Sequence, residues 1–171
     1  MEYQVEMIPQ VGIILNGKTI RLGDTRADVE QTLGGEGENV RWNSLYYFNS
    51  ELRVDFDRDG RVEFIELLGG PEGKLQPVVF GLEAFRTEPE TVVELLKEKN
   101  GGEFVDTEKG YSYAFKKLSV GLYRESIPKN VTEMIEEAEA DGHPLSAEDI
   151  EYEKRRTHWA TIGVGAEGYY E

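Results

Sequence analysis

The sequence predicts an α+β fold, an antiparallel sheet built from two helix-plus-hairpin repeats with helices packed on one face, followed by a C-terminal helical extension. Three observations predict it. Short segments alternate apolar and polar residues, which is the period of half-buried strands. Two helical segments end at paired glycines, and the same order of features recurs in the second half. We therefore expect one domain over 1–171, with repeats at 8–73 and 74–128 and an extension at 129–171.

The first repeat opens with a hairpin. Residues 11–15 are apolar, Asn16 and Gly17 form a favoured two-residue turn, and 18–22 alternate back. Thr25 and Asp28 then have the spacing of a capping box, which predicts a short helix that runs to Leu33 and stops at two glycines. An aromatic strand and a second hairpin, 52–56 with 62–66, complete the repeat.

The second repeat follows the same plan. A strand is expected at 78–80, and a capping-box pattern at 87–90 predicts a helix that ends at 100–102. The aromatic run 111–115 and the alternating run 118–122 then match the corresponding strands of the first repeat, although the spacing slips by one residue.

The last part of the chain is predicted to be mainly helical. One helix has an apolar stripe from Val131 to Ala138 with glutamates on its other side, and closes at 141–142. Ser146 opens another, which we expect to carry Ile150, Tyr152 and Trp159. The end, 162–165 followed by two tyrosines, is either a further strand or a flexible aromatic tail.

Composition narrows the range of functions. The 171 residues include no cysteine, which excludes disulfides, zinc-thiolate sites and cysteine nucleophiles. The formal net charge of −15 repels phosphate backbones and anionic lipids, so we expect no nucleic-acid and no membrane partner. The same charge attracts a basic protein. The N-terminus has no signal-peptide pattern, so a cytoplasmic location is expected, and the sequence says nothing of oligomeric state.

Residues 55–66 match a calcium loop letter by letter. Its ligands would come from Asp55, Asp57, Asp59 and Glu66, with a glycine at position 60. The flanks alternate like strands instead of forming helices, and strict alternation would place Glu66 on the opposite face from Asp55 and Asp57 unless a bulge intervenes. We interpret 57–60 as a hairpin turn and expect neither a metal nor a cofactor. A calcium-binding module remains the first alternative.

Signatures of catalysis are weak. The two histidines, His143 and His158, have no metal-ligand spacing, and Ser112 and Ser126 have no adjacent base. Carboxylates are too numerous for any pair to stand out. An enzyme with a carboxylate-based site is therefore the second alternative, and no catalytic residue is assigned.

The stretch from Leu22 to Val29, the pair 33–34, the run 46–48 and the hairpin residues 54–56 and 59–62 resemble the small α/β repeat of the BamE and β-lactamase-inhibitor-protein group. The resemblance implies a continuous sheet made of tandem copies, with an open face that binds other proteins. The absence of cysteines and the C-terminal helices depart from the group. Inhibition of β-lactamase is therefore not carried over.

We thus expect a protein-binding or inhibitory protein, for example an immunity-type protein that neutralises a basic toxin through an acidic surface. Aromatic side chains supply contact area with a polar tip at such interfaces. Strand alternation buries about half of them, so only a minority should be exposed. The candidates for partner contact are Trp42, Tyr46, Tyr47, Tyr111, Tyr113 and Tyr123.

Overall fold

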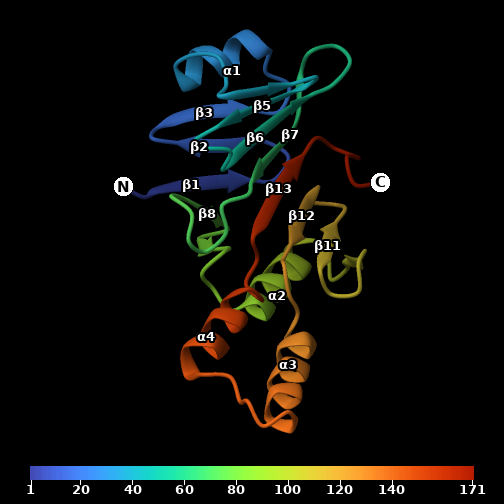
Figure 1. Ribbon diagram of the computed structural model, residues 1–171. Coiled ribbons are helices and arrows are strands. Elements are labelled where there is room, and N and C mark those ends of the chain that lie inside the picture. The colour runs from blue at the N-terminus through green and yellow to red at the C-terminus, as the bar shows by residue number, and fades with distance from the viewer.

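The computed structural model describes residues 1–171, apart from the side chain of Asn39. It is an α+β protein with four helices and two mostly antiparallel sheets (Figure 1). The prediction of a single sheet was wrong, because the N-terminal strands and the strand after residue 74 form a sheet of their own. No helix in the described chain is long and apolar enough to span a membrane.

The smaller sheet has the strand order β3-β2-β1-β8-β9. Its strands are β1 (Tyr3–Ile8), β2 (Gly12–Leu15), β3 (Lys18–Arg21), β8 (Leu75–Val79) and β9 (Leu82–Glu83). Asn16 and Gly17 join β2 to β3 with φ of 52° and 76°, as a two-residue primed turn requires, so the predicted hairpin is confirmed. β1 and β8 pair in parallel, a pairing that the sequence did not predict.

The larger sheet has the order β10-β11-β12-β13-β7-β6-β5-β4, with antiparallel neighbours throughout. Its strands are β4 (Asn39–Arg41), β5 (Ser44–Tyr47), β6 (Leu52–Phe56), β7 (Val62–Leu67), β10 (Val105–Asp106), β11 (Ser112–Phe115), β12 (Val120–Tyr123) and β13 (Thr161–Gly165). β13 settles the alternative left open for the C-terminus in favour of a strand. It lies between β7 and β12 and joins the two meanders into one sheet (Figure 1).

The two meanders of the larger sheet have equivalent registers. The equivalent cross-strand pairs are Tyr47–Leu52 and Phe115–Val120, Arg53–Glu66 and Gly121–Gly163, and Val54–Ile65 and Leu122–Ile162. Where β7 meets β13, Glu66 pairs with Gly163. A half-turn of the sheet about this pair exchanges the cross-strand pair on one side of it with the pair on the other side. β7 therefore corresponds to β13, and β6 to β12.

The helices differ in how firmly they join the core. α1 (Arg26–Leu33) has the predicted capping box between Thr25 and Asp28. α2 (Pro89–Lys99) begins at a proline with Glu88 as N-cap and no side-chain cap, so the predicted box at 87–90 was wrong. α3 (Pro128–Ala140) and α4 (Ala147–Arg155) lie at the end of the molecule away from the smaller sheet and α1 (Figure 1).

One continuous hydrophobic core includes side chains from both sheets, α1 and α2. Val5 and Ile13 come from the smaller sheet, Ile65 and Val164 from the larger one, and Leu96 from α2; all five are fully buried. Trp159 was predicted to lie on the last helix. It instead follows that helix, is fully buried, and donates its indole N–H to the carbonyl oxygen of Pro89 at 3.1 Å.

Candidate functional site

The helical arm, defined as residues 127–155, connects β12 to β13 and consists of α3, α4 and the loop between them. Pro128 at the first helical position starts α3, because proline's fixed φ suits that position. Ser146 starts α4 by accepting a hydrogen bond from the backbone N–H of Asp149 at 3.0 Å. Both helices are therefore encoded by local signals, independent of the sheet.

The arm is acidic and little of it is buried. Between residues 133 and 153 there is no lysine or arginine, and nine carboxylates occur: Glu133, Glu136, Glu137, Glu139, Asp141, Glu148, Asp149, Glu151 and Glu153. Among the described side chains of α3 and α4, Val131 alone is buried. Met134 and Tyr152 are large apolar side chains that remain 39% and 56% exposed. Beyond Val131 the predicted apolar stripe is thus only partly covered, since Met134 is exposed and Ile135 and Ala138 are half-buried.

The two ends of the arm are held together at its base. The backbone N–H of Ser126 donates to the carbonyl of Arg156 at 3.2 Å. Arg124, which is 3% exposed, donates from Nη1 to the carbonyl of Thr157 at 3.2 Å and lies 4.5 Å from the ring centre of Trp159. This buried guanidinium anchors the strand that enters the arm to the strand that leaves it.

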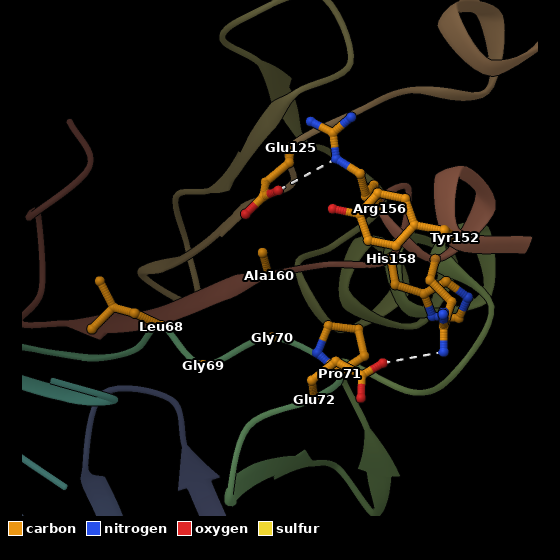
Figure 2. Close-up of a pocket in the computed structure, with 11 residues that line it drawn as sticks. Leu68, Gly69, Gly70, Pro71, Glu72, Glu125, Tyr152, Arg156, His158 and Ala160 are labelled. Atoms are coloured by element: carbon orange, nitrogen blue, oxygen red, sulfur yellow. Dashed lines mark hydrogen bonds and ion pairs between the residues drawn. The ribbon is translucent and has the colours of Figure 1, made fainter. Parts of the chain in front are cut away.

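A pocket of about 210 Å³ lies beside the arm, between loop residues 68–72 and the end of α4 (Figure 2). Arg156 pairs with Glu125 at 3.5 Å and Glu153 at 3.0 Å, and Arg155 pairs with Glu72 at 3.3 Å. Since both guanidinium groups already have carboxylate partners, the two arginines fix the arm to the body and do not present free cations in the pocket.

His158 completes the wall of that pocket. Its Nδ1 lies 3.1 Å from the carbonyl oxygen of Phe85, so this nitrogen carries the proton and the ring is held in place. The residue thus makes a structural hydrogen-bonding contact.

The hairpin β6–β7 carries a charge cluster. Arg53 Nη1 lies 3.3 Å from Glu66 Oε1, and Arg53 Nη2 lies 3.1 Å from Asp55 Oδ2. Asp55 also accepts a hydrogen bond of 2.6 Å from the hydroxyl of Ser44. A bulge shifts the register between Asp55 and Phe56, so the expectation that Glu66 faces away from Asp55 was wrong. Both carboxylates lie on one face of the sheet, on either side of a guanidinium.

Burial raises the pKa of Glu66 to about 7, with Asp55 adding to the rise and Arg53 opposing it. Its side chain is 15% exposed. A carboxyl group that titrates near neutral pH in a partly enclosed site is typical of functional sites, although ion-pair networks also produce it.

The C-terminal tail lies on the same sheet face. Tyr169 stacks on Phe64 with ring centres 4.5 Å apart, and Tyr170 meets the same ring edge-on at 6.2 Å. A Cβ atom at Gly121 or Gly163 would collide with Tyr170 or Phe64, so these glycines make room for the aromatic rings. Burial, and next the nearby Glu66, raise the pKa of the Tyr170 phenol far above its usual range.

The other residues of the calcium-loop match have structural partners. Asp57 Oδ1 accepts hydrogen bonds from the backbone N–H groups of Asp59, at 2.9 Å, and Arg61, at 3.0 Å. Gly60 has φ of 76° and donates to the Asp57 carbonyl at 3.0 Å, which closes the predicted hairpin turn. Within the described part of the chain, no three histidine, cysteine, aspartate or glutamate side chains are placed to hold a metal ion.

The six candidate aromatics do not form one patch. Trp42 is 97% exposed in the turn between β4 and β5, and Tyr123 is 40% exposed at the end of β12. Tyr46 is half-buried on the face that carries Arg53. The remaining three have internal partners: Tyr47 donates to the Gly35 carbonyl at 2.9 Å, the Tyr111 hydroxyl accepts from Asn130, and Tyr113 packs on Trp159 and Phe104.

The charge cluster and the exposed arm are sites that the sequence did not predict. The alternation of Arg53 and Asp55 on one strand was visible, but the bulge that brings Glu66 beside them has no clear sequence signal. The run of nine carboxylates without a basic residue was a signal that could have singled out the arm.

Comparison with known proteins gives no further guidance. No family model, no curated protein and no solved structure matches the chain.

Proposed function

We propose that this chain is a protein-binding protein whose helical arm docks on a basic surface of another protein. The observation that carries the proposal is the arm itself, which has nine carboxylates in all and one buried side chain on its two helices. Helices that contribute so little to a core do not stabilise the fold by burial. A carboxylate-rich surface accelerates encounter with a positively charged partner and rejects negatively charged ones.

The register equivalence of the larger sheet supports a separate role for the arm. In the first meander the four-residue turn 57–60 closes the β6–β7 hairpin, whereas the arm closes the equivalent strands β12 and β13. Since a short turn suffices for one hairpin, closing the sheet does not explain the presence of the arm. We infer that the arm was retained for an interaction outside the sheet.

We also propose that the two meanders are copies of one unit, a helix followed by four strands. In this scheme the second copy ends at β13 instead of at residue 128, and the arm is an insertion within it. The proposed resemblance to the BamE and β-lactamase-inhibitor-protein group rests on this unit. It adds to the expectation of protein recognition.

The test is affinity capture at low ionic strength with two variants of equal charge. The arm variant replaces Glu136, Glu137, Glu139 and Glu151 by glutamine, and the control variant replaces Glu6, Glu36, Glu94 and Glu167. All eight side chains are exposed. We expect a basic protein to bind the wild type and the control, to bind the arm variant at least about tenfold more weakly, and to dissociate as salt is raised. Equal binding to both variants would reject the arm as the docking surface.

An immunity-type role is a narrower form of the same proposal. If it holds, the gene beside this one encodes a basic toxin, and co-expression of this chain protects cells from it. The arm variant should lose that protection while the control variant keeps it. A non-toxic neighbour would remove the immunity role and leave the binding role to the capture experiment.

A further inference from the structure

A cavity of about 260 Å³ opens on the face of the larger sheet that carries Arg53, between the C-terminal tail and the β10–β11 loop. Glu66 and Glu108 supply carboxylates to its lining, and Arg53 supplies a guanidinium group. The aromatic rings of the lining are those of Phe64, Tyr113, Tyr123, Tyr169 and Tyr170. Aromatic faces and carboxylates together favour organic cations, because both attract positive charge while the rings also contact the carbon stem.

Arg53 already demonstrates how this sheet face holds a guanidinium group. Its head group lies between Asp55 and Glu66, and its Cζ lies 5.3 Å from the centre of the Phe64 ring. Two carboxylates and one aromatic ring thus surround a single guanidinium group.

The position equivalent to Arg53 in the second meander has no side chain. Under the register equivalence, Gly121 corresponds to Arg53 and Gly163 to Glu66. Glu66 lies at the join, where it is paired with Arg53 on one side and with Gly163 on the other. Rings of Tyr170 and Phe64 occupy the space directly above these two glycines, and Gly121 also lines the cavity.

The groups around the cavity have a net negative charge, which favours the binding of another cation. Arg53 and Asp55 on β6 and Tyr169 and Tyr170 on the tail interact with Glu66. The other titratable groups that line the cavity are Glu108, Tyr113 and Tyr123. When Asp55, Glu66 and Glu108 are all ionised they carry three negative charges, whereas Arg53 carries one positive charge.

We propose that this cavity is a binding site for an arginine or lysine side chain of the basic partner, with Glu66 as its counter-ion. The partner's basic character rests on the proposed function, whereas the site itself can be tested without a partner. Glu66 must be ionised to pair with the incoming cation, so binding releases the proton that burial retains on the free carboxyl group.

The experiment titrates the full chain with N-acetyl-arginine amide and follows backbone amide signals by NMR. The isosteric and uncharged N-acetyl-citrulline amide is the matched control. We expect the arginine compound to shift the signals of Gly121 and Gly163 and the citrulline compound to leave them unchanged. Because the pKa of Glu66 is about 7, the arginine compound should bind about tenfold more tightly at about pH 8 than at about pH 6.

Two variants complete the test. Glu66→Gln should weaken binding and abolish its pH dependence, while Glu136→Gln, on the arm, should change neither. No shift at the two glycines, equal binding of citrulline, or an unchanged pH dependence in Glu66→Gln would each overturn the proposal. If Glu66→Gln does not fold, the pH series on the wild type decides. The arm variant should still bind the arginine compound. A failure of the cavity proposal can therefore be distinguished from a failure of the proposed docking by the arm.

Discussion

The hairpins β6–β7 and β12–β13 have the same register but are completed in opposite ways. The first is closed by a tight turn and carries the Arg53–Glu66 ion pair, whereas the second is interrupted by the helical arm and has Gly121 and Gly163 in the equivalent places. The apolar pairs that face the core are the part that both hairpins share. These pairs therefore specify the sheet, whereas the turn and the outer face are free to acquire other roles.

The largest expected effect comes from filling the glycine position in the second hairpin. A valine at Gly163 would overlap the Phe64 ring and approach the Tyr170 hydroxyl, whose oxygen would lie 3.2 Å from the new Cβ. We expect Gly163→Val to lower the free energy of unfolding by about 3 kcal/mol, as overpacking does in a well-packed site. Urea unfolding measures the change.

A double variant tests the cause of that loss. Adding Phe64→Ala to Gly163→Val removes the ring that the valine would meet. The double variant should therefore be less destabilised than the sum of the two single changes. Additive losses would mean that Gly163 is needed for another reason.

The next effect concerns the ion pair of the first hairpin. Glu66 has a folded-state pKa of about 7 against an ordinary value of 4.5. The protonated carboxyl group therefore stabilises the folded state in full when the pH is below 4.5, the pKa in the unfolded state. This contribution is lost as the pH rises through about 7, the pKa in the folded state. Glu66→Gln does not titrate, so it should gain about 3 kcal/mol relative to the wild type between about pH 4 and about pH 8.

Chemical denaturation at both pH values measures that gain. Glu136→Gln on the arm is the matched control, and its stability should follow that of the wild type at both pH values. A Glu66→Gln variant that is less stable than the wild type at the higher pH would show that the ion pair with Arg53 outweighs the cost of burial.

The smallest effect compares one glycine in each connection. Gly60 in the turn and Gly142 in the arm have φ of 76° and 77°, and a Cβ atom at either meets no neighbour. Alanine is strained equally at both, by about 1 kcal/mol. Gly60→Ala should lower global stability by that amount, whereas Gly142→Ala should leave it almost unchanged, because an exposed arm opens without unfolding the sheets. Equal losses would show that arm and sheets unfold together.

Local signals in the sequence predicted much of the fold. The Asn16–Gly17 hairpin, the box at Thr25 and the turn ending at Gly60 were confirmed because each depends on residues within a few positions. β1 was missed although Tyr3, Val5 and Met7 alternate with polar residues. Its parallel pairing with β8 joins residues about 70 positions apart, for which no local pattern exists.

The site was less predictable for the same reason. The Arg53–Glu66 pair depends on a bulge, and the cavity depends on β13 reaching β7 from the other end of the chain. Both arise from tertiary pairing. The arm's helices were predictable from their caps. Their position outside the core was not, because the core residue Trp159 lies beyond the end of α4 and not on it.

Removal of the arm tests whether the two sheets fold without it. Residues 127–155 are excised, and Ser126 is joined to Arg156, with which it is hydrogen-bonded, through the turn sequence Asp-Arg-Asp-Gly of the first hairpin. Arg124 and Trp159 are retained as anchors. We predict a dispersed backbone NMR spectrum in which the signals of β4 to β7 and of the smaller sheet keep their positions. A collapsed spectrum would contradict the claim that the arm is an insertion the sheets do not need.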